Sequence, residues 1–229
     1  MKKCPGLFVA GTNTDVGKTH VGAMIARSLV AAGYNIGVCK PAESGCRREG
    51  DQLIAADAQT LWQAADRPGK LSQVCPQRFE AALAPPQAAA LEDSSVNAQL
   101  LRSCVDQWRE ASEIVLVEGA GGLMSPLSAD DYNVDLADDL GLPLVIVAAN
   151  ELGVINATLQ TIITARALAP NLPIAGVVLN QTAELADDQS VERNAEQLRL
   201  RCDVPLLATV SCGQNDFDPQ IDWFTLAGN

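Results

Sequence analysis

The segment from Leu7 to His20, LFVAGTNTDVGKTH, decides the fold of this chain. Leu7–Ala10 form a short apolar run that predicts a buried strand, and the glycine-containing run Gly11–Thr19 follows at once. A pattern of helical period extends from Lys18 to Ala32. A strand that passes through such a loop into a helix beginning with Gly-Lys-Thr is the setting of a phosphate-binding loop. We therefore expect the chain to bind a nucleoside triphosphate together with Mg²⁺.

The residues of this loop have separate expected roles. Backbone N–H groups of the loop and of the helix start point at the phosphates, Lys18 reaches their outer oxygens, and the Thr19 hydroxyl binds Mg²⁺. Gly17 leaves room for close approach. The usual pattern has a glycine where this chain has Thr12, so the loop is a variant form. A chance Gly-Lys-Thr is the competing explanation, and the preceding strand argues against it.

Outward from this segment, buried strands and amphipathic helices alternate along the chain. Further strands are predicted at 36–39, 114–117, 144–148, 174–179 and 205–210, and further helices at 55–65, 97–109, 154–168 and 187–201. This alternation predicts an α/β fold of the P-loop NTPase type, with a mostly parallel sheet, helices on both faces and ligands beyond the carboxyl ends of the strands. Four prolines interrupt the pattern between Arg67 and Glu92, where we expect an irregular excursion.

Composition limits the classes of protein that remain. The 229 residues fit a single domain, 1–229, and 48% apolar with 19% charged residues are typical of a globular protein. A net charge of -12 disfavours nucleic acid as a partner. The seven scattered cysteines indicate neither a disulfide framework nor a zinc site, and no apolar run reaches the ~20 residues that span a bilayer. We expect a cytoplasmic protein without a membrane partner.

Candidate functional residues follow two more strands. Glu118 ends the apolar run 114–117 and is the candidate acidic ligand for Mg²⁺, with a flexible glycine turn, 119–122, after it. Lys40 and Ser44 follow the strand 36–39 at the same edge of the sheet, although a strand-end lysine is commonly just a solvated charge. Asp51 and Asp57 are further possible metal ligands, and the residues alone do not choose between them.

The chain offers little for hydrolytic or zinc chemistry. Its single histidine, His20, lies in the first turn of the predicted helix, where we expect it to pack or cap locally rather than act as a base. The sequence has neither a G-x-S-x-G motif nor paired His and Cys residues. Nucleophilic hydrolases and zinc enzymes are therefore not indicated.

Four ordered motifs together make the chain resemble the dethiobiotin synthetases: GTNTDVGKT (11–19), KPAESG (40–45), VEGAGG (117–122) and LGVIN (152–156). The resemblance extends from Leu7 to about Val210. It implies an ATP-dependent ligase of biotin synthesis that converts 7,8-diaminononanoate, CO₂ and ATP into dethiobiotin, ADP and phosphate. In such enzymes one amine captures CO₂ as a carbamate, the carbamate attacks the γ-phosphoryl group, and the second amine displaces phosphate to close the ureido ring.

The resemblance also implies residue roles. Lys18 and Lys40 would be catalytic cations, and Thr19, Asp57 and Glu118 would hold Mg²⁺. The nucleotide would contact a set that includes Asn180 near the base: Asp15, Val16, Gly17, Lys18, Thr19, His20, Asp57, Glu118, Gly119, Ala120, Gly121 and Asn180. The diamine would contact Thr14, Lys40, Ser44 and Gly121, together with Leu152, Gly153 and Asn156 from the other subunit of a homodimer. Gln181 and Ser211 depart from the usual family residues, which leaves the base preference open.

Three alternatives differ in class. Cobyrinic acid synthases have a similar loop but carry an additional glutaminase domain, for which 229 residues leave no room. Plasmid-partitioning switch ATPases have a signature lysine where this chain has Asn13. A regulator or kinase built on the same fold is the third alternative, and one sequence does not separate it from a synthetase.

Overall fold

The fold is built on one mainly parallel sheet, seen in a computed structural model that describes residues 4–183 and 189–228. Within these residues the main sheet has six strands, and all of its neighbouring pairs are parallel. In spatial order they are β10 (Leu206–Val210), β9 (Ile174–Asn180), β8 (Leu144–Ala149), β1 (Gly6–Gly11), β7 (Ile114–Gly122) and β2 (Ile36–Cys39). The predicted fold class is confirmed, whereas the extension of one domain over all of 1–229 stays a prediction.

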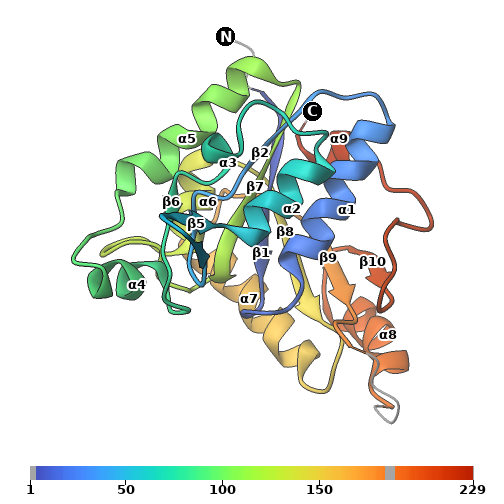
Figure 1. Cartoon of the computed structure of the whole chain (residues 1–229). Helices are drawn as coiled ribbons and strands as arrows, with labels where there is room; N and C mark the ends of the chain where they lie inside the picture. Colours follow the sequence, from blue (N-terminus) through green and yellow to red (C-terminus); the bar gives the residue numbers. More distant parts are fainter. Residues whose placement is uncertain (1–3, 184–188, 229) are drawn as a thin grey trace.

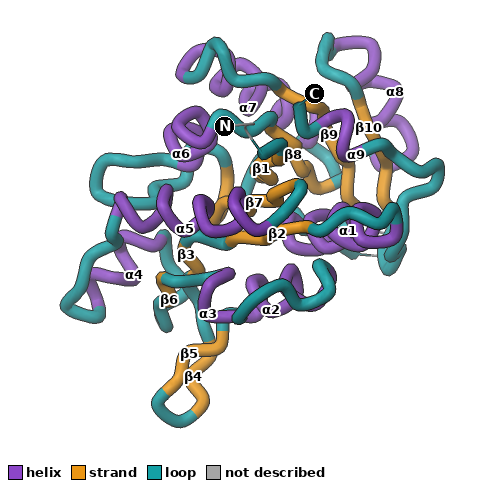
Figure 2. Tube along the Cα trace, turned by 90° about the horizontal axis from the view of Figure 1, so that it is seen from above, coloured by secondary structure: helices purple, strands orange, loops and turns teal. Residues whose placement is uncertain are grey.

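Helices cover both faces of this sheet (Figure 1, Figure 2). One face carries α1 (Lys18–Ala31), α2 (Ala56–Ala64) and α9 (Trp223–Leu226), and the other carries α5 (Ala98–Ala111), α6 (Asn133–Leu140), α7 (Val154–Leu168) and α8 (Val191–Arg201). This division follows from right-handed crossovers, because the chain first moves from β1 to β2 and then back across the sheet. Ligands of such sheets bind where the direction of winding reverses, which here is beside β1.

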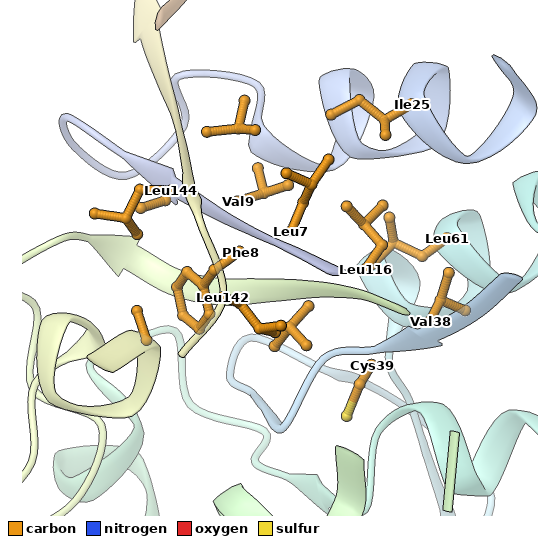
Figure 3. Close-up of a cluster of buried hydrophobic side chains, with 14 of the residues drawn as sticks. Leu7, Phe8, Val9, Ile25, Val38, Cys39, Leu61, Leu116, Leu142 and Leu144 are labelled. Atoms are coloured by element: carbon orange, nitrogen blue, oxygen red, sulfur yellow. The ribbon is translucent and has the colours of Figure 1, made fainter. Parts of the chain in front are cut away.

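The core lies on both sides of the central strands. Every residue of β1 is buried, and Figure 3 shows Leu7 and Val9 on the side of Ile25 in α1, with Phe8 on the opposite side of the strand. Alternate side chains of a strand point to opposite faces, so a strand covered on both sides needs an uninterrupted apolar run. This is why Leu7–Ala10 could be recognised as a buried strand.

Predicted and observed elements agree along most of the chain. Strand 36–39 and helix 154–168 match in both bounds, and the other predicted strands and helices are present with ends shifted by a few residues. The predicted helix 187–201 begins at Val191 instead, and its first two predicted residues lie outside the described residues.

Two predictions about the loops were wrong. The stretch 119–122 is the end of β7 rather than a turn, and Gly122 pairs with Gly11 of β1. The stretch 67–92 is not irregular throughout, since it holds α3 (Leu71–Val74), β6 (Gln77–Arg78) and α4 (Pro85–Leu91). Prolines at the first helical positions lose no hydrogen bond, so Pro85 and Pro86 start a helix instead of breaking one.

Two small sheets were not predicted. Strand β3 (Ala42–Glu43) pairs in parallel with β6, and β4 (Arg47–Glu49) forms a hairpin with β5 (Gln52–Ile54) that projects from the rest of the fold (Figure 2). Helices α6 and α9 were missed as well. Among the helices that the structure describes, none combines the length and apolarity needed to cross a membrane.

Candidate functional site

The loop between β1 and α1 forms an anion-binding helix start. Gly17 is the N-cap residue of α1, in the left-handed conformation with φ 86°, and no side chain caps the helix there. The first N–H groups of α1 therefore lack a side-chain acceptor. Such groups, aligned with the positive end of the helix dipole, are suited to phosphate oxygens.

Gly17 is required by both its conformation and its surroundings. A Cβ atom at this position would lie 2.0 Å from Asn180 Nδ2, which donates a hydrogen bond of 3.0 Å to the Val16 carbonyl oxygen. Asn180 is buried at the end of β9, so this bond ties the phosphate loop to a second strand. The amide of Asn180 thus serves the loop in this structure, and its predicted contact with the base stays a prediction.

Gly17→Ala is expected to lower the melting temperature and to abolish tight nucleotide binding. The left-handed conformation alone costs a non-glycine residue about 1–2 kcal/mol, and the clash with Asn180 adds to that cost. Gly33→Ala is the matched control, because Gly33 has a similar φ of 90° but a Cβ there meets nothing within 4 Å. Thermal melting and calorimetry on both variants check this. Equal losses of nucleotide affinity in the two variants would contradict it.

Four side chains from different elements meet below the loop. Lys40, at the end of β2, is 2% exposed, and its Nζ donates hydrogen bonds to Glu118 Oε1 at 2.6 Å, to Asp57 Oδ2 at 3.0 Å and to the Gly119 carbonyl oxygen at 3.3 Å. The Thr19 hydroxyl donates to the same Glu118 oxygen at 2.8 Å. Lys40 is therefore no solvated surface charge, and it joins the predicted metal ligands in one cluster.

The two lysines of the site have opposite pKa shifts. Burial would lower the pKa of Lys40, but the carboxylates of Glu118 and Asp57 outweigh burial and raise it. Burial and the neighbouring Lys40 ammonium lower the pKa of Lys18, and within the described part of the chain its Nζ makes one hydrogen bond, of 3.3 Å, to the Asn13 carbonyl oxygen. Glu118, Asp57 and Asp15 offset this only in part, so Lys18 is a buried cation that phosphate oxygens would stabilise further.

The two aspartates that the residues alone left as possible metal ligands, Asp51 and Asp57, lie in different surroundings. Asp57 lies in the first turn of α2, and although burial would raise its pKa, Lys40 holds that pKa below the usual value. Asp51 is exposed at the turn of the β4–β5 hairpin and does not line the cavity described below. Of the two, only Asp57 is placed to act with Thr19 and Glu118.

The oxygen atoms here fit a magnesium ion. Glu118 is fully buried, and its Oε2 has no hydrogen-bond partner in the described structure, a costly state for a carboxylate. Two carboxylates and one hydroxyl are the hard oxygen donors that Mg²⁺ takes together with phosphates and water. Within the described residues, no group of three or more His, Cys, Asp or Glu side chains is arranged to hold a metal.

A cavity of about 590 Å³ opens above this cluster. Most of the predicted site residues line it: Thr14, Asp15, Gly17, Lys18, Thr19, His20, Lys40, Ser44, Asp57, Ala120, Gly121 and Asn180. Val16, Glu118 and Gly119 are buried beside it without lining it. Leu152, Gly153 and Asn156 lie elsewhere, exposed at the start of α7.

Five further residues line the cavity, of which the sequence had singled out only Gln181, as a departure from the usual family residue: Glu43, Gln181, Thr182, Cys212 and Gly213. Gln181 and Thr182 follow β9, and Cys212 and Gly213 follow β10, so the rule that ligands sit at the carboxyl ends of strands could have found them. His20 also lines the cavity, and its Nε2 donates to the carbonyl oxygen of Gln214, a residue far away in sequence, at 2.7 Å. That His20 does not act as a base stays a prediction.

Asn133 is another residue that the sequence did not reveal. It is 1% exposed, and its Nδ2 donates to the carbonyl oxygens of Ala120 and Gly122 at 2.7 and 2.8 Å while its Oδ1 accepts from the Ala120 N–H at 3.1 Å. A Cβ at Gly119 would lie 2.3 Å from that oxygen. Asn133 therefore fixes the glycine-rich end of β7 and explains why Gly119 carries no side chain.

Comparisons with known proteins agree with this geometry. A family model described as an AAA domain matches residues 5–214. The ATP-dependent dethiobiotin synthetase BioD of Rhodopirellula baltica is 42% identical over 214 residues, which is 89% of this chain and 82% of the relative. The protein of the same description from Halalkalibacterium halodurans is 35% identical over 89% of this chain and 83% of its own length.

Solved structures resemble the fold at low identity. A plasmid partition protein from Borrelia burgdorferi superposes with a TM-score of 0.57 at 12% identity, covering 99% of this chain and 95% of that one. The MinC:MinD cell division complex of Aquifex aeolicus gives a TM-score of 0.54 at 12% identity, with 90% and 81% covered. At such identities the likeness shows the fold alone, and it gives no support to a partitioning role.

Proposed function

The chain belongs to the family of ATP-dependent dethiobiotin synthetases, and we propose that it closes the ureido ring of dethiobiotin from 7,8-diaminononanoate, CO₂ and ATP. It is an ATP-dependent ligase of biotin synthesis that acts on small molecules. The observation that carries the proposal is the meeting of Lys40, Thr19, Asp57 and the buried Glu118 beneath the phosphate loop. All of these except Glu118 line the cavity, together with Lys18 and Ser44.

Each step of this reaction creates or moves negative charge, which the two lysines are placed to hold. A carbamate forms from one substrate amine and CO₂, its oxygen attacks the γ-phosphoryl group with departure of ADP, and the second amine then displaces phosphate. Lys18 would hold the phosphate oxygens, and Lys40 the carbamate and the transferring phosphoryl group. Fixed cations in a water-poor site stabilise such charge more strongly than water does.

Thr19, Asp57 and Glu118 would hold Mg²⁺, and the support for this is that Glu118 Oε1 lies 2.8 Å from the Thr19 hydroxyl and 2.6 Å from Lys40 Nζ, which also contacts Asp57. When bound, the ion neutralises the β- and γ-phosphate oxygens. Nucleotide affinity measured by calorimetry is expected to fall when a chelator removes Mg²⁺, and an unchanged affinity would contradict the assignment.

A homodimer would bring Leu152, Gly153 and Asn156 of the partner chain to the carboxylate of the diamine. The start of α7 is suited to an anion, because Gly153 caps it in the left-handed conformation without a side-chain acceptor. Large apolar side chains are exposed on or beside α7, with Leu152 at 83%, Ile163 at 64% and Leu168 at 53%. The proposed interface would cover these side chains.

Ile163→Asp is expected to shift the mass in light scattering from twice the chain mass of 24.1 kDa toward one chain, because a charge in the interface would be buried without a partner. The KM for the diamine should rise while nucleotide affinity is kept. Leu200→Asp is the control, since Leu200 is 70% exposed on α8. A wild-type protein that elutes as a monomer would refute the dimer.

The reaction itself is tested by incubating the protein with MgATP, the diamine and ¹³C-bicarbonate. Mass spectrometry is expected to find dethiobiotin with a single added ¹³C in the ureido carbon. Unlabelled product, or no product, would exclude the proposed route. A cytoplasmic location remains a prediction from the sequence, and the preferred base stays open.

A further inference from the structure

Helix α2 begins without a cap of its own. Its N-cap residue is Ala55, which offers no side-chain acceptor, although the first N–H groups of a helix need one. Ala55 is 2% exposed, so solvent does not supply the missing acceptor freely. The same helix start carries Asp57, whose carboxylate contacts Lys40 in the candidate site.

Glu43 takes the place of the missing cap. It comes from β3, is 5% exposed, and its two carboxylate oxygens accept the N–H groups of Asp57 at 3.0 Å and of Ala58 at 2.9 Å. These are the second and third residues of α2, the donors that a local N-cap side chain normally satisfies. One buried carboxylate thus accepts the backbone N–H groups of both Asp57 and the residue that follows it.

The backbone of Glu43 is itself fixed. Its carbonyl oxygen accepts the Phe79 N–H at 2.9 Å in the β3–β6 pairing, so the cap stands on a small sheet rather than on a loose loop. The pKa of Glu43 lies above its usual value, mainly because the side chain is buried and also because the Asp57 carboxylate is near. Lys40 and the two N–H groups lower that pKa, but only in part. A second carboxylate next to Asp57 is costly, and a helix cap alone could be made by serine or asparagine.

We propose that Glu43 is a positioning residue that fixes the start of α2 and thereby sets the Asp57 carboxylate at the metal and phosphate site. The inference rests on the proposed role of Asp57 in holding Mg²⁺. Residues that orient a metal ligand typically change metal affinity about 10- to 100-fold when they are removed. Glu43 lines the cavity, but its carboxylate is aimed at the helix start, so it acts through Asp57.

The test compares Glu43→Ala with three other variants. For each, calorimetry measures the affinity for a non-hydrolysable ATP analogue over a range of Mg²⁺ concentrations. Glu43→Ala is expected to raise the half-saturating Mg²⁺ concentration about tenfold and to leave binding in chelator unchanged. Asp57→Asn should have a similar effect, and the double variant should be no worse than Asp57→Asn alone, because the two residues act in one unit. Glu43→Ala with Ala55→Ser supplies a local cap and should recover most of the Mg²⁺ affinity.

Asn97→Ala is the matched control for loss of a cap, because Asn97 accepts the Leu100 N–H at the start of α5 and does not line the cavity. It should destabilise the protein without changing the Mg²⁺ requirement. Additive effects of the Glu43 and Asp57 variants, or an unchanged Mg²⁺ requirement in Glu43→Ala, would overturn the inference.

Hydrogen exchange separates this inference from the proposed function. In the protein without nucleotide, Glu43→Ala should remove protection of the Asp57 and Ala58 amides, whatever reaction the enzyme catalyses. Protection that survives the substitution overturns the capping role itself. A wild-type protein that makes no dethiobiotin, yet shows the expected exchange and Mg²⁺ effects, would refute the synthetase assignment and leave the role of Glu43 standing.

Discussion

Replacing Lys40 with glutamine is expected to lower kcat about 10²- to 10³-fold while nucleotide affinity stays within about threefold of the wild-type value. Lys40 Nζ lies between Glu118 and Asp57, where the carbamate and the transferring phosphoryl group would meet. A positioned cation of this kind contributes about 3–4 kcal/mol to the transition state. Single-turnover kinetics and calorimetry measure the two quantities separately.

The same substitution should destabilise the protein without ligands. Lys40 and Glu118 are both buried, and loss of one partner of a buried ion pair leaves an uncompensated charge at a cost of about 3–5 kcal/mol. Lys70→Gln is the control, since Lys70 is exposed. If Lys40→Gln weakened nucleotide binding as strongly as turnover, Lys40 would be a binding residue and the proposed role would be wrong.

Lys18→Met is expected to have the opposite effect on stability and a large effect on binding. Burial and Lys40 lower the pKa of Lys18, so the folded state disfavours its charge, and the protein without ligands should melt at the wild-type temperature or above it. Methionine keeps the apolar stem. Loss of charge-assisted hydrogen bonds to phosphate should weaken nucleotide binding about 10- to 100-fold.

Calorimetry with the ATP analogue and thermal melting check both parts of this prediction. The melting shift that nucleotide produces in the wild type should largely disappear in Lys18→Met. A variant that bound nucleotide with undiminished affinity would show that Lys18 does not contact the phosphates, and the assignment of the loop would fail with it.

The parts of the fold that the sequence predicted correctly depend on local patterns. The apolar run before Gly11 and the helical period after Lys18 each arise from neighbouring residues, and they identified β1 and α1. The end of β7 was missed because its glycines have low strand propensity. Pairing with β1 overrides that propensity, and a Cβ at Gly122 would lie only 3.3 Å from the Thr12 carbonyl oxygen.

In the candidate site too, local patterns could be predicted from the sequence and contacts between distant segments could not. Lys18 and Thr19 could be identified because their motif is contiguous, whereas the choice between Asp51 and Asp57 needed the hairpin that carries Asp51 away. Glu43 and Asn133 were missed because their partners are distant in sequence. Glu43 bonds to residues 14 and 15 positions away, and no spacing rule connects a strand residue with a helix that lacks its own cap.

The most direct test of the synthetase assignment is phosphate release from MgATP in the presence of diaminononanoate and bicarbonate, separately and together. If the cavity serves carbamate phosphorylation, release should be strongly stimulated only when both are present, because the carbamate that attacks ATP needs both. A rate with the pair that equals the rate with neither would contradict the synthetase function and return the chain to the wider class of P-loop ATPases.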